Sequence, residues 1–337
     1  MTRVALLGYG LAGRIIHRPV LQAVPHLEIT HVVTGDPERS AQARADLPAA
    51  QVLPNAEVLW DRHAEFDVVV VATTNPSHVP LATRSLQLGK LTVVDKPLAI
   101  TTVEALALVA LSDRSGVPLT VFQNRRWDSD TLTAATLLRS GTLGAVVRLE
   151  SRFTRFRPQV VDRWREDASA GGGVLLDLGS HVVDQALHLL GPAVEVYAEV
   201  DTRRAGGQAD DDCFLALTHA SGARSHLWAS MSAPWTGPRL VLQGTAAGWS
   251  KDGLDGQEDA QRARTTTAAE PDGLLWTPEG AHPYPSMPGD WAAFYRDVAA
   301  TATTGSAVPV DPHEAVQVLR VLDAARESSA TRTVVQL

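Results

Sequence analysis

Three polar residues recur at helical spacing just after three consecutive glycines. The segment spans residues 171–184 and reads GGGVLLDLGSHVVD. If a helix begins near Asp177, then Asp177, His181 and Asp184 lie at i, i+4 and i+7 on one stripe. A histidine beside carboxylates suits proton transfer near neutral pH. The alternatives are a structural histidine with solvated aspartates, or a metal site, which we do not expect because no second histidine stands at ligand spacing.

A lysine ends one of the predicted buried strands. The sequence VVDKPL covers residues 93–98, and Lys96 follows the strand predicted over residues 91–94. Ligands of open parallel sheets bind at the carboxyl ends of the strands, so Lys96 is a candidate for contact with a substrate. The alternative is a solvated lysine at a strand end.

A glycine-rich loop follows the first predicted strand and leads into a helix. Residues 8–13 read GYGLAG. Such glycines allow a tight turn and close approach to a pyrophosphate, while the helix N-terminus offers N–H groups. We therefore predict dinucleotide binding rather than a glycine-rich turn without a ligand. The predicted cofactor contacts of this loop are Gly8, Gly10, Leu11, Ala12 and Gly13.

The tip of the second predicted strand carries signals for both NAD and NADP. Asp36 could accept a hydrogen bond from a ribose hydroxyl, whereas Thr34 and Arg39 could bind a 2′-phosphate. Asp36 stands one residue beyond the usual acidic position and precedes Pro37, which is the pattern of a helix N-cap with proline at N1. We expect NADP in preference to NAD, with NAD as the open alternative.

The predicted secondary structure that positions these residues differs between the first third of the chain and the rest. The first third alternates short apolar runs with helical stretches, which predicts a parallel sheet. A helix begins at Asn75-Pro76 and ends at Gly89. The strands predicted in this part cover residues 4–7, 29–33, 68–72, 91–94 and 119–122. Later strands, at 145–156, 194–201, 214–218, 224–231 and 239–243, lack interposed helices. We predict a dinucleotide-binding domain over residues 1–121 and an α+β domain over residues 122–337, with a final helix from Asp311-Pro312 to about Ser329.

Composition excludes several classes of protein. The chain has 337 residues, 45% of them apolar, a net charge of -8 and a single cysteine. No basic cluster indicates nucleic-acid binding, and no apolar run approaches the roughly 20 residues that cross a bilayer. With no signal peptide expected and no disulfide possible within the chain, we expect a soluble cytoplasmic protein.

Taken together, these motifs resemble the Gfo/Idh/MocA family of oxidoreductases. The glycine loop, the TTNPSH sequence of residues 73–78, the DKP sequence of residues 95–97 and the histidine helix carry the resemblance, which spans nearly the whole chain. It implies an α/β Rossmann domain joined to an α+β domain with an open-faced, mostly antiparallel sheet, with the nicotinamide between them. One departure is Asp95, where most members carry glutamate.

The resemblance also implies roles for individual residues. Lys96, Asp177 and His181 match the catalytic residues of the family, and Asn124, Arg125 and Asp184 match substrate-pocket positions. For Arg125, Arg126 and Trp164, ion pairing or core packing is the alternative. The positions that match cofactor contacts are Thr73, Asn75, His78, Asp95, Trp164 and Arg165.

Three further stretches resemble bacterial scyllo-inositol dehydrogenases within that family: residues 123–130, residues 155–160 with 163–165, and residues 252–259. The resemblance implies hydride transfer between NAD(P) and a secondary hydroxyl of a cyclic polyol or sugar, and a homo-oligomer, dimer or tetramer. A non-catalytic NAD(P) sensor and a redox-assisted glycosidase are the alternatives.

Overall fold

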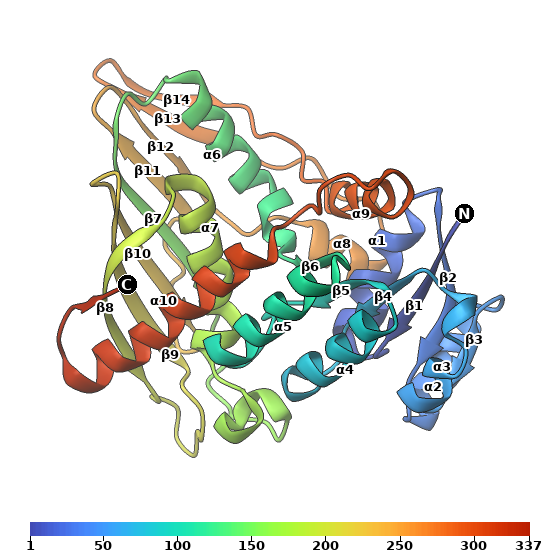
Figure 1. The fold of residues 1–337 in the computed structure, drawn as a ribbon. Coiled ribbons are helices and arrows are strands. Elements are labelled where there is room, and N and C mark those ends of the chain that lie inside the picture. The colour runs from blue at the N-terminus through green and yellow to red at the C-terminus, as the bar shows by residue number, and fades with distance from the viewer. The chain divides into compact units, whose positions relative to one another are not determined.

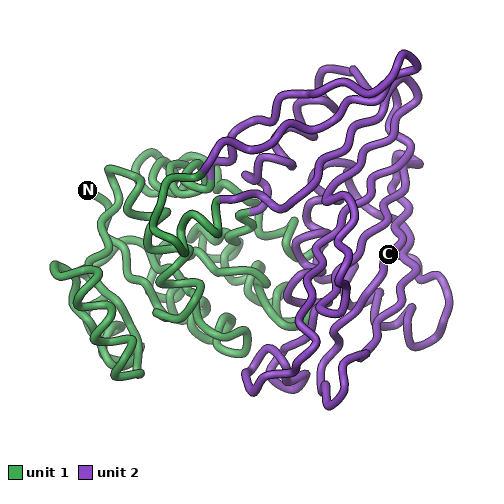
Figure 2. The backbone as a smooth tube through the Cα atoms, turned by 180° about the vertical axis from the view of Figure 1, so that it is seen from behind, with its two compact units in different colours: residues 1–124, 257–267, 291–316 green, residues 125–256, 268–290, 317–337 purple.

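The computed structural model describes residues 1–337, which form two compact units (Figure 2). The first unit contains residues 1–124, 257–267 and 291–316, and the second contains residues 125–256, 268–290 and 317–337. The chain thus returns twice to the first unit after leaving it. Those two returning segments fall within the range that we assigned, from the sequence, to the second domain.

The first unit is built on a six-stranded parallel sheet. Its strand order is β3-β2-β1-β4-β5-β6, which is the doubly wound order of dinucleotide-binding domains. The strands are β1 (Thr2–Leu7), β2 (Leu27–Val33), β3 (Gln51–Leu53), β4 (Val68–Val71), β5 (Leu91–Asp95) and β6 (Leu119–Phe122). All four valines of β4 are fully buried, as expected for a central strand covered on both faces. The order reverses between β1 and β4, so ligands of such sheets bind beside the ends of these strands.

Helices connect the strands of this sheet (Figure 1). They are α1 (Arg18–Gln22), α2 (Pro37–Asp46), α3 (Ala56–Trp60), α4 (Asn75–Gln87) and α5 (Thr102–Ser115), joined by α8 (Gln257–Ala263) and α9 (Ala292–Thr304) from the returning segments. Because crossovers are right-handed, the helices before β2 and after β4 lie on opposite faces. The helix after β4 begins as predicted at Asn75, but its N-cap is Thr74.

The second unit is built on a nine-stranded mixed sheet. Its order is β14-β13-β12-β11-β7-β10-β9-β8-β15, in which β7 and β10 are parallel and all other neighbours are antiparallel. The strands are β7 (Val146–Thr154), β8 (Ala193–Asp201), β9 (Asp212–His219), β10 (Arg224–Ser230), β11 (Leu240–Gly244), β12 (Gly248–Lys251), β13 (Gly273–Thr277), β14 (Gly280–Tyr284) and β15 (Val335–Gln336). This arrangement confirms the predicted fold class.

One face of the second sheet is buried and the other is open. Side chains along β9 alternate between half-buried and buried, the pattern of an antiparallel sheet covered on one side only. The helices of this unit are α6 (Ser129–Ser140), α7 (Ser180–Leu190) and α10 (Pro312–Thr331), the last of which begins in the first unit. Val316, Leu319 and Leu322 of α10 are buried, as its apolar spacing predicts. None of the helices has both the length and the hydropathy to span a bilayer.

Candidate active site

The glycine loop after β1 is built for close backbone approach. Gly8 has φ +94°, and a Cβ there would overlap the carbonyl oxygen of Ala72. A Cβ at Gly13 would overlap the carbonyl oxygen of Gly8. The loop leads into a π-helical turn over Ala12–His17, with Leu11 at its N-cap. These contacts leave a cradle that larger residues would fill, which fits a bound pyrophosphate.

Asp36 caps the helix that follows β2. Its Oδ1 accepts a hydrogen bond of 2.9 Å from the backbone N–H of Arg39, with Pro37 at N1, so the predicted capping role is confirmed. Arg39 is exposed, and its Nη1 lies 3.8 Å from the position that a Cβ on Gly10 would take. Thr34 is buried at the end of β2. The guanidinium of Arg39 therefore lies beside the glycine loop while the Asp36 carboxylate is engaged with the helix.

His78 links the loop after β4 to the turn after β5. Its Nδ1 lies 2.8 Å from the carbonyl oxygen of Pro97, and its Nε2 lies 3.3 Å from that of Thr73. Burial lowers the pKa of His78, although Asp95 and the two carbonyls favour protonation. The imidazole joins two backbone segments at the carboxyl edge of the sheet, while Asn75 beside it is buried. Whether His78 or Asn75 also contacts a cofactor stays a prediction.

Lys96 follows β5 at the carboxyl end of the sheet. Its backbone N–H donates to Oδ1 of Asp95 at 2.9 Å, and its side chain is half-buried. The Lys96–Pro97 peptide bond is cis. Lys96 is thus placed at the edge where the doubly wound sheet binds ligands, as the sequence predicts.

The triglycine of the second unit makes room for a helix cap. Gly173 has φ +108°, and a Cβ there would overlap the carboxylate of Asp210. Asp210 Oδ2 accepts a 2.6 Å hydrogen bond from the backbone N–H of Leu175, at the start of the histidine helix. Burial raises the pKa of Asp210. Sequence reasoning missed this residue, because it lies 35 positions from its partner and carries no local signal.

The predicted catalytic helix begins earlier than expected and with a wider turn. A π-helical turn covers Leu175–Gly179, and α7 continues from Ser180. Asp177 is 26% exposed, with its Oδ2 3.7 Å from Nε of Arg165. His181 is buried, with its ring 5.7 Å from that of Phe153. The stripe therefore presents a half-exposed carboxylate next to a buried imidazole.

Asp184 is held by a buried arginine. Its two carboxylate oxygens accept hydrogen bonds of 3.0 and 2.7 Å from Nε and Nη2 of Arg126. Both side chains are buried. A bidentate pair of this kind fixes the carboxylate geometrically, and its role toward substrate stays a prediction.

Arg125 and Asn124 occupy the short helical turn after β6, and both are buried. Nη1 of Arg125 donates to Asp128 at 2.9 Å, and its guanidinium lies 4.7 Å from the centre of the Phe153 ring. In the loop before the triglycine, the guanidinium of Arg165 lies 4.4 Å from the ring centre of Trp164. The structure therefore gives Arg125 the ion pair that the sequence left as its alternative.

Comparison with known proteins decides the family. The description "Oxidoreductase family, NAD-binding Rossmann fold" matches residues 2–123, and "GFO/IDH/MocA C-terminal domain" matches residues 131–250. The chain is 34% identical to scyllo-inositol 2-dehydrogenase (NADP(+)) IolW of Bacillus subtilis, covering 99% of this chain and 96% of that protein. The chain belongs to the Gfo/Idh/MocA oxidoreductase family.

Other members of the Gfo/Idh/MocA family are similar over the same length. The solved structure of the B. subtilis oxidoreductase yvaA superposes with a TM-score of 0.93 at 33% identity, covering 99% of this chain and 98% of that one. D-xylose 1-dehydrogenase (NADP(+)) 2 of Haloferax volcanii is 30% identical over 95% of this chain and 94% of its own. This Gfo/Idh/MocA protein is an NAD(P)-dependent dehydrogenase with an NAD-binding Rossmann domain.

One stretch that resembles inositol dehydrogenases has a structural role in this Gfo/Idh/MocA protein. Asp255 accepts a 2.7 Å hydrogen bond from the backbone N–H of Ser129 at the start of α6. Gln257 accepts another of 2.8 Å from the N–H of Trp291. The 252–259 stretch therefore holds other elements in place.

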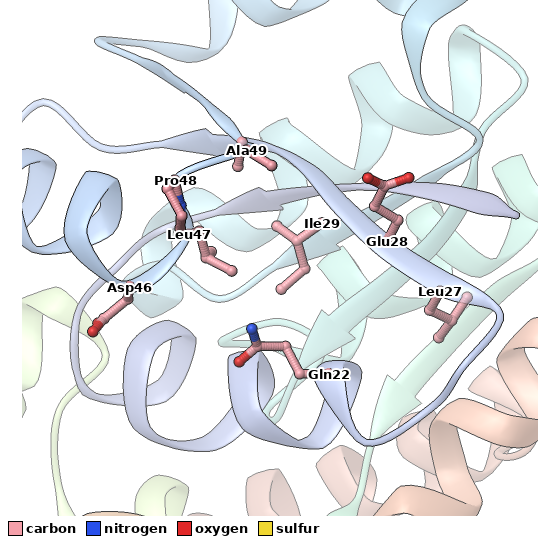
Figure 3. A pocket seen from close by; sticks show the side chains of 9 residues that line it. Gln22, Leu27, Glu28, Ile29, Asp46, Leu47, Pro48 and Ala49 are labelled. Atoms are coloured by element: carbon pink, nitrogen blue, oxygen red, sulfur yellow. The ribbon is translucent and has the colours of Figure 1, made fainter.

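A hollow on the first unit is lined by other residues. Gln22 of α1, Ile29 of β2 and Asp46 at the end of α2 line it (Figure 3). Asp46 also accepts hydrogen bonds from the hydroxyl of Tyr9 at 3.1 Å and from Nε of Arg14 at 2.8 Å. None of the predicted site residues lines the hollow, so it is not part of the candidate site.

The carboxyl of Asp128 has an unusual proton affinity. Burial raises the pKa of Asp128 to about 7, with Asp130 and Asp255 adding to the rise and Arg125 opposing it. The folded protein therefore binds a proton that the unfolded chain has lost, and the free energy of unfolding falls as pH rises from about 4 through 7.

Replacing Asp128 with Asn should remove this pH dependence. We expect the wild type to lose about 1 to 2 kcal/mol of unfolding free energy between about pH 5.5 and pH 8, relative to Asp128→Asn. Urea unfolding at both pH values measures it, with Asp162→Asn at an exposed position of the same unit as the control. Equal pH dependence in wild type and Asp128→Asn would show that Asp128 is ionised throughout.

Proposed function

We propose that this protein oxidises a secondary hydroxyl of a neutral cyclic polyol, with scyllo-inositol and myo-inositol as first candidates. The observation that carries the proposal is the 34% identity to a scyllo-inositol 2-dehydrogenase over 99% of this chain. A sugar such as an aldose is the second candidate, supported by the similarity to a D-xylose dehydrogenase.

The charges around the predicted pocket residues support a neutral substrate. Two buried arginines each lie against a buried aspartate: Arg126 against Asp184 at 2.7 Å and Arg239 against Asp130 at 3.2 Å. An arginine already paired with a carboxylate offers little net charge to an anionic substrate. Hydroxyl groups, in contrast, can accept and donate hydrogen bonds at paired side chains.

In the proposed mechanism, His181 takes the proton of the reacting hydroxyl. Asp177 orients the substrate or the imidazole, and Lys96 donates a hydrogen bond to the reacting oxygen. This bond is stronger when the oxygen becomes alkoxide-like, so it favours the transition state over the bound alcohol. Bound NAD(P) supplies the hydride acceptor, and the glycine cradle formed by Gly8 and Gly13 fits its pyrophosphate.

We further propose that NADP is the preferred cofactor. The Asp36 carboxylate is engaged in capping, and the Arg39 guanidinium lies beside the glycine loop. Both features favour a 2′-phosphate over a free ribose hydroxyl. The NADP(+) in the names of two relatives agrees with this choice.

Arg39→Ala should separate the two cofactors. We expect KM for NADP to rise about 10-fold or more while KM for NAD changes less than about twofold, because only the phosphate loses a charge-assisted contact. Steady-state kinetics with both cofactors measures this. Arg44→Ala, at an exposed position of the same helix, is the control. Equal effects on NAD and NADP would contradict the assignment of Arg39.

Net cofactor reduction distinguishes a dehydrogenase from its alternatives. Purified protein is incubated with NAD or NADP and each inositol isomer or aldose, and absorbance of the reduced nicotinamide is followed. We expect stoichiometric accumulation with at least one cyclic polyol. A sensor would produce none, and a redox-assisted glycosidase would recycle its cofactor without accumulation. Turnover of open-chain hydroxy acids alone would overturn the polyol assignment.

We also propose a homo-oligomer that forms through the open face of the second sheet. Phe214 and Trp228 lie on that face with their rings 5.2 Å apart, and the guanidinium of Arg152 lies 4.0 Å from the Trp228 ring centre. Aromatic and arginine side chains are enriched in protein interfaces. Light scattering during gel filtration measures the mass, and a monomer at micromolar concentration would refute the proposal.

A further inference from the structure

His17 is a fully buried polar residue at the end of the turn that leaves the glycine loop. Its ring lies 4.4 Å from the ring of Phe122, within an aromatic cluster. Nδ1 of His17 lies 2.6 Å from the hydroxyl of Tyr295, and Nε2 lies 3.6 Å from Oδ1 of Asp95. A buried polar group is costly unless it is paired, and packing alone would be served by an apolar residue. His17 therefore connects two specific polar partners.

The contacts of His17 indicate which atom of each pair carries the proton. Burial and the nearby Asp95 raise the pKa of Tyr295 well above its usual value, so the phenol keeps its proton. Because Nε2 of His17 faces a carboxylate oxygen, which can only accept, we place the ring proton on Nε2, so that Nδ1 accepts from the Tyr295 hydroxyl. The Nε2–H group faces Oδ1 of Asp95.

Asp95 is kept as a carboxylate at the end of the chain. Although burial opposes ionisation, His17, Lys96 and His78 together hold the pKa of Asp95 below its usual value. These groups come from the first helical turn, from the turn after β5 and from α4, while Tyr295 faces the same cluster from α9. Oδ1 of Asp95 also accepts the backbone N–H of Lys96 at 2.9 Å. The one oxygen thus joins His17 to the main chain of Lys96.

We infer that Tyr295, His17 and Asp95 form a chain of polar contacts, here called the His17 chain, that positions Lys96 at the reacting oxygen; the Tyr295–His17 link is a hydrogen bond and the His17–Asp95 link is a contact of 3.6 Å between a ring nitrogen and a carboxylate. The inference rests on the proposed role of Lys96. It adds three positioning residues, two of which, His17 and Tyr295, lie 278 positions apart in the sequence. Because His17 belongs to the turn after the glycine loop, the chain also joins the predicted cofactor cradle to Lys96.

Single-atom changes test the His17 chain. Tyr295→Phe removes only the hydroxyl, and Asp95→Asn removes the charge while keeping the shape. Asp95→Asn should lower kcat for polyol oxidation about 10- to 100-fold, the effect of losing one charged partner. Tyr295→Phe should lower kcat less, by about 3- to 10-fold, because a hydrogen bond between neutral groups is weaker, and KM for the cofactor in this variant should change less than about threefold. Asp95→Glu should restore most of the activity.

The pH profile separates positioning from a merely structural effect. Asp95→Asn removes the anion beside Lys96, so the pH profile of kcat should differ from that of the wild type. Asp95→Glu, which keeps the anion, should return the profile to that of the wild type. His31→Gln, at another buried histidine of the same unit, is the control and should leave kcat and the profile unchanged.

A measurement without turnover tests the chain itself. In ¹⁵N-histidine NMR of the whole protein, His17 should show an unprotonated Nδ1 and a protonated Nε2, and Tyr295→Phe should shift the Nδ1 signal. A proton on Nδ1 of His17 would overturn the chain whatever the activity.

The activities of the variants distinguish a failure of the His17 chain from a failure of the proposed role of Lys96. If Lys96→Met is impaired but Tyr295→Phe and Asp95→Asn keep the wild-type kcat and pH profile, the His17 chain is wrong and the proposed function survives. If Lys96→Met retains full activity, the proposed role of Lys96 fails and the inference fails with it.

Discussion

Lys96→Met should lower kcat for polyol oxidation by about 100- to 1000-fold, the usual effect of losing one group that stabilises a developing oxyanion. Methionine keeps the length and the apolar stem but cannot donate a hydrogen bond to the reacting oxygen. Cofactor affinity should change less than about threefold, because the proposed role of Lys96 is at the substrate. Steady-state kinetics and tryptophan fluorescence titration with NADP measure the two quantities.

Lys90→Met is a matched control for this substitution. Lys90 precedes the same strand, β5, at its opposite end, where its Nζ donates to the carbonyl oxygen of Phe66 at 3.0 Å. Its replacement removes a lysine of the same unit without touching the carboxyl edge of the sheet. We expect near-normal kcat in Lys90→Met, and near-normal kcat in Lys96→Met would remove Lys96 from the mechanism.

His181→Ala should have the second large effect, on both rate and pH dependence. Loss of a general base lowers turnover by about 10²- to 10⁴-fold. In the wild type, the rate of oxidation should rise with pH as the imidazole loses its proton, and this rise should disappear in the variant. Rate profiles from about pH 5 to pH 10 measure both effects.

His188→Ala provides the control on the same helix. His188 lies seven positions further along α7 and is exposed, so its loss should leave the profile intact. Free imidazole added to His181→Ala should restore part of the activity and its pH dependence. A His181→Ala protein with the wild-type rate and profile would show that another group is the base.

Local patterns were sufficient to predict the sheet of the first unit and the glycine loop. The apolar run of β4 and the glycines after β1 depend only on neighbouring residues, and the structure places both as expected. Asp36 was likewise predicted to cap a helix from the adjacent proline alone. The short edge strand β3 was missed, because three residues carry too little periodicity.

Long-range partners could not be predicted from local patterns. Asp210 caps a helix 35 residues away, and Tyr295 reaches His17 from a segment that we assigned to the second domain. The wider turn at Leu175–Gly179 also gave no signal in the spacing of Asp177 and His181. In each case tertiary packing, rather than local preference, decides the contact.

Transfer of deuterium tests the central claim most directly. A cyclic polyol, scyllo-inositol first, is labelled with deuterium on its carbinol carbons and incubated with the wild-type protein and NADP, and the reduced cofactor is examined by proton NMR. We predict one deuterium at C4 of the nicotinamide for each ketone formed. Reduced cofactor without deuterium, or no reduced cofactor with any cyclic polyol or sugar, would contradict hydride transfer from a secondary hydroxyl.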